Sequence, residues 1–200
     1  MSFDIHASYR LVSEAVRQTE SVEAGMKRLL TVLCRRPQLS RLTTLKSYDF
    51  GFEAQRIESW LAGVLTLEPP QRRIKAYWFG LFNPVRNGNT GADIYVVGAD
   101  KFNPDDESFE WACDPVYEPR HRYCGSRANE DLFLATKALP PESQATAAYV
   151  LQLGFSALAV RRALHTIPRR LLLSGASTRA VAVGFDSGDA LLLEPIATAA

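Results

Sequence analysis

The chain has 200 residues, of which 46% are hydrophobic and 22% are charged, and its formal net charge is +1 at pH 7. These values are ordinary for a globular protein with a sizeable core, and the length predicts a single domain over residues 1–200. The near-neutral charge argues against a general affinity for nucleic acid or for an anionic membrane surface.

Neither a signal peptide nor a membrane-spanning segment is expected. Residues 1–10 show no basic region followed by an apolar run, and no stretch approaches the roughly 18 apolar residues of a membrane span. Three cysteines do not make a disulfide framework in a chain of this length. The sequence therefore predicts a cytoplasmic protein with reduced thiols.

The first third of the chain predicts helices. Apolar side chains recur at three- and four-residue steps in residues 10–34, which predicts one helix, or two shorter ones because Thr19, Ser21 and Gly25 weaken its middle. Residues 52–67 also place their apolar side chains on one face, and two prolines at 69–70 end this second helix.

The middle of the chain predicts strands. Residues 74–82 are rich in β-branched and aromatic side chains on both faces, as in a central strand. With turn residues at 83–84 and 87–89, residues 74–97 predict an antiparallel hairpin with a long loop. Residues 109–113 are expected to form a third short strand, and residues 114–127 an ordered loop.

The last third predicts helices at 126–139 and 143–167, the second of them almost entirely apolar. Gly154 lies in the middle of the second helix, where it costs about 1 kcal/mol relative to Ala, so it indicates close approach of another element. Residues 180–185 and 190–194 predict a hairpin, and Asp186 and Asp189 in its turn are expected to bond their own backbone.

These separate runs of helices and strands predict an α+β fold. We expect an antiparallel sheet of about five strands, with helices packed at the N-terminus and between the strand groups. A third, weaker hypothesis makes the apolar helix 143–167 a dimerisation surface; the sequence does not predict the oligomeric state.

No pattern typical of an enzyme site stands out. Neither a Walker loop nor a spaced glycine fingerprint is present, and no cofactor is predicted. Cys113, His121 and Cys124 are the only concentration of soft metal ligands, and without a second Cys/His pair they do not predict a metal. The alternative hypothesis is an enzyme with an unfamiliar site around Cys113, Asp114, His121 and Cys124, although catalytic partners usually come from distant segments.

The most informative irregularity is acidic. Between residues 93 and 118, eight acidic residues stand against Lys101 alone, a local charge of −7 in a nearly neutral chain. Aromatic residues are interleaved with them, and charge plus aromatic area is typical of a specific protein-binding surface. The simpler alternative is an acidic loop that faces water while its aromatic rings turn into the core. The predicted partner-binding residues are Asp93, Tyr95, Asp100, Asp105, Asp106, Glu107, Glu110, Trp111, Asp114 and Glu118.

Several stretches carry a resemblance, namely residues 78–82 (WFGLF), 93–98 (DIYVVG), 111–115 (WACDP) and 117–123 (YEPRHRY). Together with the final hairpin, they resemble a family of uncharacterised bacterial proteins, some of which are immunity partners of secreted toxins. The resemblance implies a non-catalytic protein that neutralises a cognate toxin by covering its functional surface. The acidic segment would suit a basic, nucleic-acid-cleaving toxin. Nucleic acid itself is not an expected partner, because the basic clusters lack interleaved aromatic residues.

Overall fold

The computed structural model describes residues 4–86, 89–106, 108–186 and 189–198. Its helices are α1 (Ile5–Gln18), α2 (Val22–Leu33), α3 (Phe50–Leu67), α4 (Arg127–Lys137), α5 (Pro141–Ala148), α6 (Gly154–Thr166) and α7 (Arg169–Leu173). A 3₁₀ segment, Pro37–Ser47, joins α2 to α3, and a π-helical turn, Tyr149–Leu153, joins α5 to α6. No helix in these ranges is long and apolar enough to cross a membrane.

The main sheet has the strand order β5-β4-β1-β6-β7. Its strands are β1 (Ala76–Phe82), β4 (Asp93–Ala99), β5 (Tyr123–Gly125), β6 (Thr178–Phe185) and β7 (Ala190–Leu192), with β8 (Ile196–Ala197) also paired to β6. A separate two-stranded ribbon consists of β2 (Val85–Arg86) and β3 (Asn89–Thr90). The predicted α+β class is confirmed, with a mostly antiparallel sheet, helices at the N-terminus and helices between the strand groups.

Both predicted hairpins are present. β1 pairs with β4 from Ala76↔Ala99 to Phe82↔Asp93, and β6 pairs with β7 around Val183↔Leu191. The centre of the sheet is the parallel pair β1–β6. This pair is parallel because the helices α4 to α7 return the chain to the end of the sheet at which β1 begins.

Three local expectations change. The helix expected at residues 10–34 is two helices, and Ser21 caps the second by accepting a hydrogen bond from the Ala24 N–H. The strand expected at 109–113 is wrong: residues Glu110–Ala112 form a single 3₁₀ turn (η2), preceded by Phe109 in the left-handed region (φ 56°). Conversely, the short edge strand β5 lies in the expected loop 114–127.

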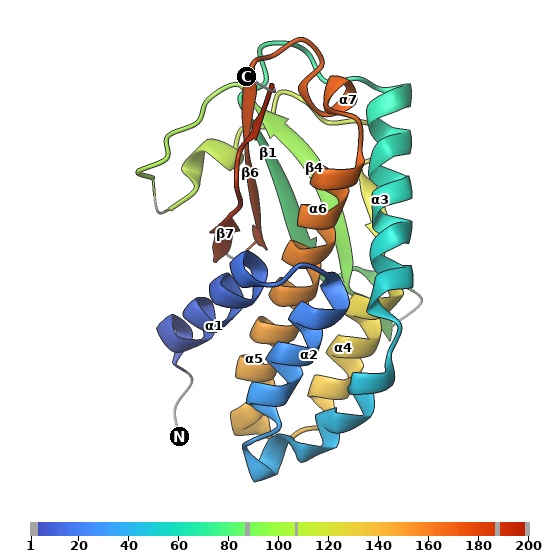
Figure 1. Cartoon of the computed structure of the whole chain (residues 1–200), viewed down its shortest axis with the longest axis vertical. Coiled ribbons are helices and arrows are strands. Elements are labelled where there is room, and N and C mark those ends of the chain that lie inside the picture. Colours follow the sequence, from blue (N-terminus) through green and yellow to red (C-terminus); the bar gives the residue numbers. More distant parts are fainter. Residues whose placement is uncertain (1–3, 87–88, 107, 187–188, 199–200) are drawn as a thin grey trace.

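The helices pack against one face of the sheet and build the main core. α6 is central in this layer, with α2 and α3 beside it (Figure 1). A Cβ placed on Gly154 would lie 2.3 Å from Leu29 Cδ1, so the predicted close approach at this glycine is confirmed. Residues 149–160 are all buried within the chain's own core, so the helix expected at 143–167 has no free apolar face for dimerisation.

Arg179 ties the helices to the sheet from inside. Its side chain is fully buried, and it donates hydrogen bonds to the Tyr77 hydroxyl and to the carbonyl oxygens of Leu172 (3.0 Å) and Gln71 (2.9 Å). The Tyr77 hydroxyl donates in turn to the Leu172 carbonyl at 2.7 Å. Burial raises the pKa of Tyr77 to about 12 even though the guanidinium opposes the shift. Backbone acceptors thus satisfy most of this cation, so we assign it a structural role.

Candidate functional site

The second face of the sheet has no helix on it among the described elements, and we call it the open face. Alternation along the strands sends one set of side chains into the helical core and the other set outward. The outward set forms a separate small cluster with Trp111, which comes from the segment after β4. Its strand members are Ala76, Trp78, Val97, Ala99, Ala180, Ala182 and Ala190.

Aromatic rings dominate the open face. Trp78 packs against Phe109 and Trp111, with ring centroids 5.9 and 6.3 Å apart, and Phe102 lies 5.4 Å from Trp111. A second group lies beside them, with Phe82, Tyr95 and Tyr123 at centroid distances of 5.4 to 5.9 Å. The register Tyr95↔Tyr123 between β4 and β5 places these two rings on the same side of the sheet. Tilted and edge-on contacts of this kind stabilise aromatic pairs beyond their buried area.

A short hydrogen-bond chain joins the two aromatic groups. The indole N–H of Trp78 donates to the Tyr95 hydroxyl at 3.2 Å, and this hydroxyl donates to Asp186 Oδ1 at 2.7 Å. Burial, followed by the bond to Asp186, raises the pKa of Tyr95 well above its usual range. The Tyr95 ring lies directly over Gly80, whose missing Cβ leaves space for it. Asp186 therefore bonds Tyr95 through its side chain, a contact outside the turn that the sequence did not predict.

Between these rings is a cavity of about 390 Å³, which we call the aromatic hollow. Two carboxylates, Glu118 and Asp186, and the guanidinium of Arg122 also line it. Arg122 pairs with Glu118 at 3.3 Å and lies over the Tyr123 ring, 5.0 Å from its centroid. Tyr123 is 52% exposed, so the hollow opens beside an accessible ring.

The end of the acidic segment is anchored to the C-terminal end of α3. The Tyr117 hydroxyl donates to the Glu68 carbonyl oxygen at 2.7 Å, and the Glu68 carboxylate accepts from the Arg120 N–H at 2.9 Å. This backbone N–H, followed by contacts with His121, lowers the pKa of Glu68. The segment therefore crosses the open face and is fixed where it leaves that face.

The predicted partner-binding residues do not all share one surface. Asp105, Glu110, Asp114 and Glu118 are exposed, Tyr95 is half-buried in the hollow, and Asp106 accepts hydrogen bonds from Ser108. Asp100 lies 3.8 Å from Arg73, so this carboxylate is partly neutralised. Asp93 and Trp111 are only 3% and 7% exposed, so they cannot belong to a free contact surface. Glu107 lies outside the described residues.

The alternative site around the cysteines does not assemble. Cys113 lines the aromatic hollow. Cys124, in β5, pairs with Ile94 of β4 and packs against the helical core, so the two thiols lie on opposite faces of the sheet. His121 bonds Glu68 through Nδ1 at 3.1 Å instead of either thiol. Burial raises the pKa of Cys124 to about 11, which leaves almost no thiolate at neutral pH. In the described part of the chain, no three His, Cys, Asp or Glu side chains converge as metal ligands.

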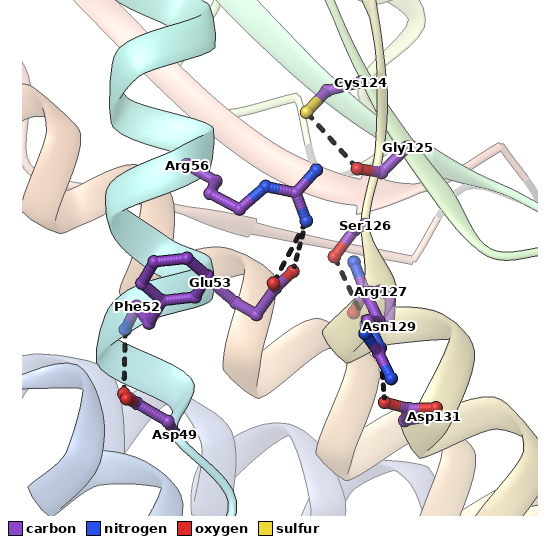
Figure 2. Close-up of polar contacts among 10 residues, drawn as sticks. All are labelled: Asp49, Phe52, Glu53, Arg56, Cys124, Gly125, Ser126, Arg127, Asn129 and Asp131. Atoms are coloured by element: carbon purple, nitrogen blue, oxygen red, sulfur yellow. Dashed lines mark hydrogen bonds and ion pairs between the residues drawn. The ribbon is translucent and has the colours of Figure 1, made fainter.

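A second polar cluster lies at the junction of α3, β5 and α4. Glu53, only 6% exposed, accepts from Arg56 at 3.0 and 3.3 Å, and both side chains project from α3 toward Cys124 and the start of α4 (Figure 2). Asn129, in α4, donates to the Ser156 hydroxyl in α6 at 2.9 Å. These contacts join helices to the sheet edge, and none of these side chains lines the aromatic hollow. We therefore place the candidate site on the open face.

Sequence reasoning missed several residues of the aromatic hollow, chiefly Trp78, Phe82, Tyr123 and Asp186. Large side chains on both faces of a strand are a usable signal for the first two, because a sheet face without a helix must be covered by something else. No protein-family model, no characterised protein and no solved structure matches the chain.

Proposed function

We propose that this chain is a non-catalytic binding protein whose open face binds a basic protein partner. The observation that carries the proposal is a set of exposed carboxylates on the segment that follows β4, whose part from Ser108 to Glu118 lines the aromatic hollow. Asp105, Glu110 and Asp114 have no ion-pair partner within the described ranges, so their charge is available to a partner. Such charges steer encounter and select a cationic partner, while buried rings at the centre of an interface provide most of the affinity.

The hollow suits a cationic side chain of the partner as its anchor. Arg122 already demonstrates this chemistry, because its guanidinium lies over the Tyr123 ring while it pairs with Glu118. A second guanidinium or ammonium group would find aromatic rings and the Asp186 carboxylate in the same cavity. The resemblance to immunity proteins makes a basic toxin, inhibited by occlusion of its functional surface, the partner class that we propose.

The test is co-expression with the product of the reading frame immediately upstream of the gene. A toxic product that is neutralised by this chain and co-purifies with it would support the proposal. A non-toxic metabolic enzyme that does not bind would refute the inhibitor class.

Charge reversal maps the surface. We expect the triple variant Asp105→Lys, Glu110→Lys, Asp114→Lys to raise the Kd at least tenfold and to lose protection of the host. The matched control reverses three exposed carboxylates on the helical layer and its flanking turn, and it changes the net charge by the same amount. These control substitutions are Glu20→Lys, Glu130→Lys and Glu142→Lys. If both triple variants weaken binding equally, net charge and not the open face governs the interaction.

A further inference from the structure

A second and larger cavity, about 910 Å³ in volume, lies on the other side of the segment that carries Phe109 and Trp111. Its walls come from α1, through His6, Tyr9 and Arg17, and from residues 102–104 and 106. All six consecutive residues from Asp189 to Glu194 also line it. Side chains of a strand alternate between the two faces, so a cavity that contacts every residue in a row follows the strand's edge. We call this cavity the edge groove; α1 lies beside β7 in Figure 1.

β7 is the outermost strand on this side of the sheet. The Leu193 N–H donates to the Val181 carbonyl at 2.8 Å, and the Phe185 N–H donates to the Asp189 carbonyl at 2.9 Å. These two bonds fix the phase of the ladder, so residues 189, 191 and 193 direct their backbone groups to β6. The N–H and C=O groups of Ala190 and Leu192 consequently point away from β6, along the edge groove.

Unpaired backbone groups at a sheet edge are a template for another strand. Natural proteins shorten or shield such an edge; here the three-residue strand has an acidic residue on each side of it, and a groove with aromatic walls runs along its edge. Phe102, Tyr9 and Tyr149 contribute rings to these walls, and Leu192 is only half-buried. The added strand would therefore find apolar contacts on both sides of its pleat.

Trp111 carries an unsatisfied polar group behind the wall of the edge groove. Its ring lines the edge groove, and its indole N–H is buried without an acceptor among the described residues. A buried donor without an acceptor costs about 1 to 3 kcal/mol.

Charge at the two ends of β7 narrows the chemistry of the occupant. Asp189 precedes the strand and Glu194 follows it, and within the described ranges neither carboxylate has an ion-pair partner. Arg17 and Arg161 lie on the opposite wall, and Arg161 is bonded to the Thr19 carbonyl at 2.7 Å. A strand with a basic residue near each end would complement the two carboxylates.

We propose that the edge groove binds an extended segment of a partner protein, which joins the sheet beside β7 as an additional strand. Its recognition rests on backbone hydrogen bonds to Ala190 and Leu192, with apolar side chains at alternate positions and basic residues near the two ends. This mode of recognition, β-strand addition, needs no pre-formed partner surface. The inference rests on the proposed function only in requiring a protein partner.

The probe for the test is a displayed library of random twelve-residue peptides selected on the whole chain. Selected peptides are then synthesised, and their Kd is measured by fluorescence anisotropy. The key variant is Leu192→Pro, which removes the outward N–H and no bond to β6, at a strand position where proline is tolerated. Leu192→Ala is the matched control because it shortens the side chain and keeps the N–H. We expect the proline variant to raise the Kd about tenfold more than the alanine variant does.

A second measurement needs no variant. In the wild-type chain, bound peptide must slow hydrogen exchange at the Leu192 and Ala190 amides. The inference is overturned if no peptide is enriched, if the two Leu192 variants weaken binding equally, or if the two amides are not protected. Each of these results leaves the charge-reversal test of the open face intact, so failure of the groove and failure of the proposed function are distinguishable.

Discussion

Adding one methyl group at Gly80 tests the geometry of the aromatic hollow. A Cβ at this position would lie 2.1 Å from Cε1 and 2.2 Å from Cζ of Tyr95, far inside van der Waals contact. The ring must move to avoid this clash, and any movement disturbs its packing on Phe82 and Tyr123 and its bond from Trp78. Gly80→Ala should therefore displace Tyr95 and deform the hollow.

The expected sign opposes the usual effect of this substitution. Alanine in place of glycine in a strand normally stabilises by about 0.5 to 1 kcal/mol. Overpacking costs about 1 to 3 kcal/mol, and the two hydrogen bonds of the Tyr95 hydroxyl contribute about 1 kcal/mol each. We expect a net destabilisation of about 2 to 4 kcal/mol, which for a chain of this size lowers the Tm by about 4 to 16 °C.

Urea unfolding followed by tryptophan fluorescence measures the loss, and a double-mutant cycle assigns it. In a Tyr95→Ala background the clash no longer exists, so Gly80→Ala should become neutral or slightly stabilising. A coupling free energy of about 2 kcal/mol or more is expected. Equal destabilisation in both backgrounds would refute the packing of Tyr95 over Gly80.

Two further predictions concern the core. Gly154→Ala should lower the free energy of unfolding by about 1 to 2 kcal/mol, because the clash with fully buried Leu29 outweighs the gain in helix propensity. Urea unfolding measures this loss of stability, and the loss should disappear in a Leu29→Ala background. Stability should also fall as the pH rises from 9 to 11, because the unfolded Cys124 thiol ionises near pH 9 and the folded one near pH 11. The destabilisation caused by Cys124→Ala should accordingly shrink across this range, and a pH-independent effect would contradict the raised pKa.

The sequence predicts the elements whose patterns are long and whose partners are local. The hairpin of β1 and β4 follows from dense apolar residues and turn chemistry, and the long apolar helix follows from its length and periodicity. The strand prediction for residues 109–113 is wrong because tertiary packing overrides local propensity. Trp111 and Phe109 cover the open face from a turn and not from a strand. β5 is missed because a three-residue strand carries too short a pattern to be recognised.

The candidate site is less predictable than the fold. The charge imbalance of residues 93–118 indicates the correct segment, but it does not separate exposed Asp105 from buried Asp93. Asp93 is buried because β4 pairs it with Phe82 of β1 and Gly125 of β5, whereas Asp105 lies in the segment after β4 and faces solvent. The hydrogen bond between Asp186 and the Tyr95 hydroxyl is equally unpredictable from the sequence, because 91 residues separate the two partners.

Phe109 links the two cavities, since its ring forms part of the wall of both. A left-handed backbone costs a residue with a Cβ about 1 to 2 kcal/mol, and here the packing of the ring on Trp78 and Trp111 offsets that cost. The aromatic hollow and the edge groove are therefore the two sides of one aromatic wall. A partner that places a cationic side chain in the first and an extended segment in the second would contact a continuous surface. Binding at both would then multiply effective affinity without any rearrangement of the sheet.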